Sequence, residues 1–281
     1  MTNSIADGVF DQLVYTLNSV PNASSLSEHC VSAIKHGVTE LIITDRWDMR
    51  KADATTPARI KIALRAIQTA AEVFERKIKI YAGVEFCHAS YTSYCIKEML
   101  AELKADVVFG SLPYLPEGEH RKPYTETDFS VWSDRSVQAY VRRYYDALHA
   151  MLQQSGIDAL TGLSGPLRVI QRQGRAYFSW YPFAKQIDRV LRLMAEREIA
   201  LVFNMDQYLC TPEAVELECE LLSRYRAFGG TTVMLGSGAQ STEHVAAGFE
   251  LAVICLRRAG FRRYCCFEDR EQFEMPLPTV E

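Results

Sequence analysis

Short apolar runs recur along the chain, and each is followed by polar or turn-forming residues. Residues 10–19 (FDQLVYTLNS) predict a short buried strand that leads into a polar turn. The later runs have the length and the β-branched and aromatic content of buried parallel strands. They are LIIT (41–44), IKIYAGVEF (78–86), DVVFGSL (106–112), IALVFN (199–204) and TTVMLGS (231–237).

Between these runs, apolar residues recur at spacings of three and four, as on one face of a helix. The clearest case spans roughly residues 134–154 and predicts an apolar stripe that packs on a sheet. Thr211-Pro212 and Ser241-Thr242-Glu243 indicate helix starts, because a capping residue precedes a proline or an acid. The stripe consists of Val137, Tyr140, Val141, Tyr144, Leu148 and Leu152.

Strand and helix patterns alternate about seven times without a compositional break, which predicts an α/β fold with one closed or nearly closed barrel. A length of 281 residues, 48% of them hydrophobic, suits a single barrel domain over residues 1–281. In such a barrel the chemistry gathers where strands end and loops begin. The positions of interest are therefore Tyr15, Asp45, Arg46, Glu85, Ser111, Asn204 and Ser237.

The charge pattern narrows the class of partner. The formal net charge is −4, and basic residues are dispersed among acidic ones, so we expect no nucleic-acid partner. The N-terminus lacks a basic start followed by an apolar run, and no segment approaches about 18 uninterrupted apolar residues. We therefore expect a cytoplasmic protein with no membrane partner, and the sequence leaves the oligomeric state open.

The order of segments resembles the polymerase-and-histidinol-phosphatase (PHP) superfamily, and most closely its histidinol-phosphate phosphatase branch, over almost the whole chain. The resemblance implies a distorted, TIM-like (β/α)7 barrel whose cluster of up to three metal ions activates water against a phosphomonoester. It rests on motifs that are specific only in combination. They are Asp11, Thr44-Asp45, Gly83-Val84-Glu85, Gly110-Ser111, Leu235-Gly236-Ser237, Ala259-Gly260-Phe261, Arg270 and Pro276-Leu277.

Most of the metal ligands of the family are replaced. Leu13-Val14-Tyr15 stands where the family has His-x-His, and Arg46 follows Thr44-Asp45 where the family has a histidine. Pro113 and Gln240 end two further motifs that end in histidine in the family. The family's fifth-strand histidine corresponds to Gly162 or Leu163 in this chain, which has no histidine there. Glu85 alone clearly remains. Because leucine, proline and glycine carry no ligand atom and arginine is permanently charged, we expect no bound metal and no cofactor.

Cys87 and His88 lie just beyond Glu85, and together these residues offer a possible set of ligands for a single zinc ion. No fourth ligand is evident. In the alternative, Cys87 fills the core and His88 begins the next helix. The eight cysteines show no paired spacing, which is typical of reduced, mostly buried thiols.

The replacements would place a phenol, a guanidinium, a carboxylate and amides around one cavity, as in a pocket for an organic ligand. Our first hypothesis is a metal-independent enzyme, a lyase, isomerase or cyclase, acting on a small anionic metabolite. Glu85 would be its general base, Tyr15 a donor and Arg46 the anion anchor. Further substrate-binding candidates are Asp45, Asn204, Gln240, Ser237 and His88.

Two alternatives stay open. In the first alternative, the chain is a pseudoenzyme that binds a ligand or serves as a scaffold, and Arg46 and Glu85 form a buried ion pair in the space of the lost metals. In the second alternative, the chain is a residual phosphatase in which Glu85 holds one metal ion together with His88 or Cys87. The polar, proline-rich segment between Leu112 and Trp132 is either a lid over the barrel mouth or an ordinary surface excursion.

Overall fold

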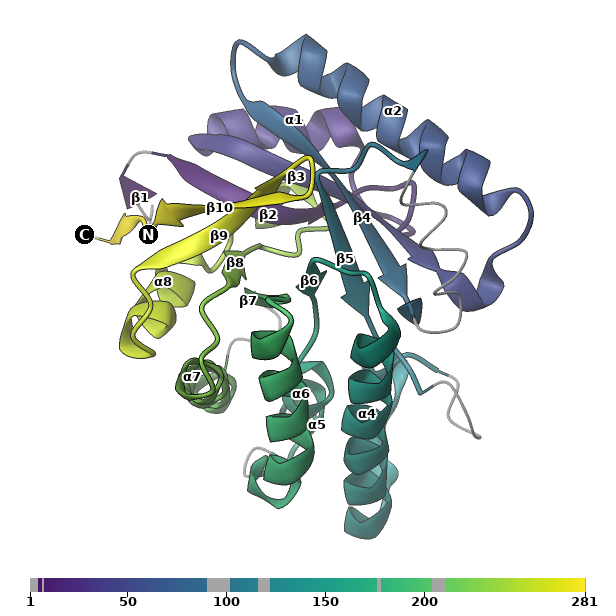
Figure 1. Cartoon of the computed structure of the whole chain (residues 1–281), viewed down its shortest axis with the longest axis vertical. Helices are drawn as coiled ribbons and strands as arrows, with labels where there is room; N and C mark the ends of the chain where they lie inside the picture. Colours follow the sequence, from purple (N-terminus) through teal and green to yellow (C-terminus); the bar gives the residue numbers. More distant parts are fainter. Residues whose placement is uncertain are drawn as a thin grey trace.

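In the computed structural model, seven parallel strands form one sheet whose order follows the sequence (Figure 1). The structure describes residues 5–6, 8–89, 102–115, 122–175, 178–203 and 211–280. Each predicted apolar run overlaps a strand, although position 204 of the fifth run lies outside the described residues. The strands are β2 (Val9–Tyr15), β3 (Val38–Asp48), β4 (Lys79–Cys87), β5 (Val107–Ser111), β6 (Ala159–Leu160), β7 (Ala200–Phe203) and β8 (Val233–Leu235).

The two edge strands of this sheet, β2 and β8, approach each other and nearly close the barrel. Val14 and Ala239 form a parallel bridge. The Tyr15 N–H donates to the Ala239 carbonyl at 2.8 Å, and the Gly238 N–H donates to the Leu13 carbonyl at 2.8 Å. The sheet is therefore the distorted, TIM-like barrel of seven strands that the family resemblance implied.

Helices surround the strands (Figure 1). The helix predicted over 134–154 is confirmed as α4, and its apolar stripe is buried against the barrel. Thr211 caps α7, since its hydroxyl accepts from the Ala214 N–H at 3.2 Å. The described helices are α1 (Leu26–Lys35), α2 (Thr56–Phe74), α4 (Asp134–Gln154), α5 (Gly165–Arg172), α6 (Ala184–Glu196), α7 (Pro212–Ala227) and α8 (Phe249–Arg258).

The helix start predicted at Ser241-Thr242-Glu243 is wrong. A short 3-10 turn occupies Thr242–His244, and α8 begins only at Phe249. Ala246 and Gly248 both have positive φ values, 59° and 76°, which a right-handed helix cannot accommodate. The capping residues therefore start a turn that ends before an α-helix can form.

A hairpin of β9 (Arg263–Glu268) and β10 (Glu271–Pro276) is anchored to the amino ends of the barrel strands. Arg270 binds both carboxylate oxygens of Asp158, at 2.9 and 2.6 Å. Near the chain ends, β1 (Ile5–Ala6) pairs antiparallel with β11 (Thr279–Val280). Among the helices of the described residues, none is long and apolar enough to cross a membrane.

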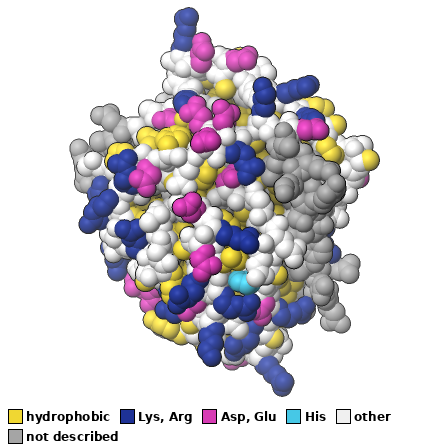
Figure 2. Space-filling model, in the orientation of Figure 1, with side chains coloured by type: hydrophobic (Ala, Val, Ile, Leu, Met, Phe, Trp, Pro, Cys, Tyr) yellow, Lys and Arg dark blue, Asp and Glu magenta, His cyan; other side chains and the backbone are white. Residues whose placement is uncertain are grey.

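Charges of both signs are interspersed over the face shown in Figure 2. On the part of this face that is not grey, Asp and Glu side chains lie among the Lys and Arg side chains, which are most frequent toward the lower edge. The surface view thus agrees with the dispersed charge pattern of the sequence.

Candidate active site at the carboxyl ends of the strands

Three candidate side chains meet at the carboxyl ends of the first three barrel strands. Tyr15 is the last residue of β2, while Arg46 in β3 and Glu85 in β4 are direct register partners. Parallel neighbouring strands end at the same rim, and residues at matched positions point to the same face. The barrel geometry therefore brings together residues that lie 70 positions apart in the sequence.

Glu85 is the centre of this group, which we call the Tyr15–Arg46–Glu85 cluster. The Tyr15 hydroxyl donates to Glu85 Oε2, and Arg46 Nε donates to Glu85 Oε1 at 3.0 Å. The guanidinium also lies over the Tyr15 ring, 4.4 Å from its centroid, in a cation–π contact. Glu85 is fully buried, whereas the Arg46 side chain is 34% exposed.

The electrostatics fix the protonation states of two members of the cluster. Burial raises the pKa of Tyr15 well above its usual value; Arg46 lowers this pKa and Glu85 raises it. Burial lowers the pKa of Arg46, but the charge of Glu85 and the neighbouring Tyr15 phenol raise it, and the net direction is well upward. Tyr15 is thus a neutral phenol that donates a hydrogen bond, and Arg46 is a permanent cation.

Sequence reasoning missed two side chains at this site. The Thr161 hydroxyl lies 3.5 Å from Glu85 Oε1, directly after the short strand β6. Tyr124 belongs to a 3-10 turn, Tyr124–Glu126, in the segment considered as a lid, and its ring packs against the turn that follows Thr161. The family resemblance marked this turn, near Gly162 or Leu163, but it did not single out Thr161, and no pattern pointed to Tyr124.

The other predicted binding residues take part in separate contacts. The Thr16 hydroxyl donates to Asp45 at 2.7 Å, and the Ser237 hydroxyl donates to Asp11 at 2.6 Å. Gln240 is exposed, and its backbone carbonyl accepts from the Ser24 N–H at 2.8 Å. Asn204 lies outside the described residues.

Cys87 and His88 have different neighbours. Cys87 Sγ accepts from the Ser111 hydroxyl at 3.3 Å, and burial raises the pKa of this thiol to about 12. The His88 ring packs on Tyr114, with the ring centroids 4.2 Å apart, and burial lowers its pKa to about 4. Because a thiol must lose its proton to bind zinc, this environment disfavours Cys87 as a ligand.

The donor set does not fit the metal cluster that the family resemblance implies. Both oxygens of Glu85 already accept hydrogen bonds from Tyr15 and Arg46, and Leu13 fills the space beside Gly236. Across the described ranges, no three His, Cys, Asp or Glu side chains gather closely enough to hold a metal ion. A fixed guanidinium would also repel a cation at this place.

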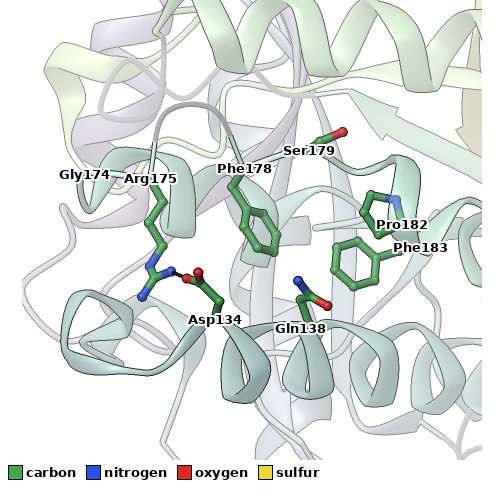
Figure 3. A pocket seen from close by; sticks show the side chains of 8 residues that line it. All are labelled: Asp134, Gln138, Gly174, Arg175, Phe178, Ser179, Pro182 and Phe183. Carbon is green, nitrogen blue, oxygen red and sulfur yellow. Dashed lines mark hydrogen bonds and ion pairs between the residues drawn. The ribbon is translucent and has the colours of Figure 1, made fainter.

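A surface pocket of about 340 Å³ lies elsewhere, between the start of α4 and the segment leading into α6 (Figure 3). Phe178 and Phe183 stack in its wall with their ring centroids 5.7 Å apart, and Arg175 pairs with Asp134. None of the cluster residues lines this pocket. It is therefore distinct from the predicted site.

The barrel and the residues at its mouth define an α/β protein with a buried, ion-paired centre where its strands end. The family model for the PHP domain matches residues 15–205, and the chain therefore belongs to the PHP family. This match confirms the resemblance drawn from the sequence motifs.

Two solved structures show the same fold. A histidinol phosphate phosphatase from Lactococcus lactis, solved with zinc, L-histidinol and phosphate, matches with a TM-score of 0.77 and 19% identity over 94% of this chain and 98% of that one. A candidate histidinol phosphatase from Listeria monocytogenes matches with a TM-score of 0.62 and 14% identity, over 86% and 98% of the two chains. A search among curated proteins finds no match.

Proposed function

We propose that this chain is a metal-independent enzyme that binds a small organic anion, a phosphate ester or carboxylate, at the barrel mouth. The observation that supports it best is the state of Arg46. Its Nε donates to Glu85, yet 34% of the side chain stays exposed, and the guanidinium has further N–H donors. That planar fork matches the oxygens of a carboxylate or phosphate.

Anion binding would also prepare Glu85 for chemistry. An anion that draws the guanidinium toward itself competes with Glu85 Oε1 for Arg46, and this oxygen then becomes available to accept a proton. Tyr15 stays neutral, because its pKa is raised, and donates to the other oxygen. A base beside a bound anion suits elimination, isomerisation or cyclisation, whereas phosphoester hydrolysis depends on metal charge.

The second candidate is a pseudoenzyme, and the burial of Glu85 favours it. Glu85 has no exposed surface and both of its oxygens accept hydrogen bonds, so in this candidate it fills and neutralises the centre of the barrel. Ligand binding would then occur without turnover. A residual phosphatase with one metal ion is the least supported reading, because Cys87 and His88 face other partners.

Binding is tested by calorimetric titration of wild-type protein with inorganic phosphate and with L-histidinol phosphate. Arg46→Lys keeps the charge but loses the fork, and we expect the dissociation constant to rise by about tenfold or more, since hydrogen bonds to charged groups contribute roughly 1.5–3 kcal/mol. Arg135→Ala, at an exposed position of α4, is the control and should bind as wild type. Unchanged binding in Arg46→Lys would contradict the anchor role.

Turnover separates the two candidates. A panel of small phosphate and carboxylate metabolites is incubated with wild type and with Glu85→Gln, and products are followed by mass spectrometry. Turnover that Glu85→Gln loses while binding persists supports the enzyme, because this change removes basicity and keeps shape. Binding without turnover on the whole panel supports the pseudoenzyme.

A further inference from the structure

Tyr124 stands at the barrel mouth although it comes from a long connection rather than from a strand end. Its backbone N–H donates to the Pro113 carbonyl at 2.9 Å, which returns the chain to the end of β5. Its ring meets that of Tyr144 edge-on, at 87° with the centroids 6.1 Å apart. Tyr124 is thus fixed by both backbone and ring contacts.

Two glycines make room for the Tyr124 ring in the turn between β6 and α5. A methyl group at Gly162 would stand 3.1 Å from the Tyr124 hydroxyl oxygen. One at Gly165 would overlap the hydroxyl end of the ring and approach its Cε2 atom to 2.9 Å. The hydroxyl of Tyr124 therefore rests directly on the backbone of this turn.

The same turn borders the Tyr15–Arg46–Glu85 cluster. Thr161, next to Gly162, presents its hydroxyl 3.5 Å from Glu85 Oε1. The charges nearby agree with this placement: burial raises the pKa of Tyr124, Arg46 and Arg168 lower it, and Glu85 raises it. The net direction is upward, so Tyr124 is a neutral O–H donor beside the turn that reaches Glu85 through Thr161.

The segment that carries Tyr124 is held firmly from the other side. The Gln173 amide donates to the Thr127 carbonyl at 2.9 Å, and its oxygen accepts from the Phe129 N–H at 2.6 Å. The Phe129 ring in turn packs edge-on against Trp132 and Tyr140, both with centroids 5.1 Å away. A donor on such a support is preorganised, which lowers the entropy lost on binding.

We propose that Tyr124 is a specificity-determining residue of the barrel mouth, whose hydroxyl donates to the same anionic group that Arg46 binds. This inference rests on the proposed function. A charged fork and a neutral hydroxyl together suit an oxyanion with several acceptor oxygens, a phosphate or a carboxylate, which can accept from both at once. Gly162 and Gly165, in the turn after β6, leave the space that the phenol ring of Tyr124 occupies.

The test is calorimetric titration of inorganic phosphate and L-histidinol phosphate into wild type and two variants. Tyr124→Phe removes only the hydroxyl, and we expect binding of both probes to weaken by about five- to tenfold, the effect of one lost hydrogen bond. Gly165→Ala places a methyl group where the Tyr124 ring lies, so the ring must move, and binding should weaken at least as much. Tyr264→Phe, which removes a hydroxyl that contacts Met275 within the β9–β10 hairpin, is the control and should leave binding unchanged.

The outcomes separate this inference from the proposed function. If Arg46→Lys weakens binding but Tyr124→Phe and Gly165→Ala bind as wild type, the proposed role of Tyr124 is wrong and the anion-binding role of Arg46 stands. If wild type binds neither probe, the proposed function fails for these anions, and the role of Tyr124 fails with it. Equal weakening in Tyr264→Phe would show that the effect is not specific to Tyr124.

Discussion

At the scale of single residues, Glu85 and Arg46 depend on each other. Glu85 is a fully buried carboxylate, and Arg46 is its only salt-bridge partner among the described residues. A buried charge is tolerated only when it is paired and hydrogen-bonded, so removing one partner leaves the other at a high free-energy cost.

This dependence predicts a rescue. Arg46→Met should lower the free energy of unfolding by about 2–3 kcal/mol, less than the roughly 3–5 kcal/mol of a fully buried pair, since Arg46 is 34% exposed and water reaches it. Adding Glu85→Gln removes the stranded charge and should restore most of the loss. Urea unfolding of the two single variants and the double variant measures the coupling. A double variant no more stable than Arg46→Met would show that the two residues do not compensate each other.

His88 predicts the response to acid. Burial lowers its pKa from 6.5 to about 4, so between these values the unfolded chain binds a proton that the folded chain does not. Stability from this group is therefore present above pH 6.5 and is lost as the pH falls toward 4, by at most about 3–4 kcal/mol at 1.36 kcal/mol per pH unit. Urea unfolding across this range should show a smaller loss in His88→Gln than in wild type. Equal losses would mean that other groups, such as His29, control the acid response.

At the scale of elements, the sequence predicted what depends on local pattern. Buried strands and the α4 stripe follow from apolar spacing, and the register of parallel strands then brings Tyr15, Arg46 and Glu85 together. The helix start at Ser241 was wrong, because residues 246 and 248 have positive φ values, and the Ala246 N–H donates to the distant Asp11 carboxylate.

The parts of the site that come from connections escaped prediction. Thr161 and Tyr124 lie in a turn and a long connection, where no periodicity indicates which side chains face the barrel mouth. Ser237 lies at a strand end as expected, but its hydroxyl binds Asp11. The preferred partner of a polar group is set by tertiary packing rather than by the local pattern.

Asp11 joins the two edge strands that close the barrel. Its carboxylate accepts from the Ser237 N–H at 2.8 Å, from the Ser237 hydroxyl at 2.6 Å and from the Ala246 N–H at 2.8 Å. Asp11→Ala would leave these buried donors unpaired, and we expect it to lower the free energy of unfolding by about 2–4 kcal/mol. Asp146→Ala removes an exposed ion pair with Arg189 and should change stability by under about 1 kcal/mol. If the two changes lower the free energy of unfolding by similar amounts in urea, Asp11 does not hold the two edge strands together.

At the scale of the whole molecule, a PHP barrel is retained around a centre that no longer fits a metal cluster. Fold and chemistry are separable, so the likeness to histidinol phosphatases does not carry their reaction with it. We expect no phosphate release from L-histidinol phosphate above background, with or without added zinc, manganese or magnesium. The assay is run beside the Lactococcus lactis enzyme as a positive control. Metal-dependent release that Glu85→Gln abolishes would contradict this expectation.

The central claim is that a phenol, a guanidinium and a carboxylate have replaced a metal cluster at the carboxyl ends of the strands. Its most direct test is elemental analysis of untagged protein purified without chelators. Since Glu85 is already bonded to Tyr15 and Arg46, we predict far less than one zinc, iron or manganese ion per chain. Reproducible occupancy near one ion per chain or above, lost in Glu85→Gln, would contradict the claim.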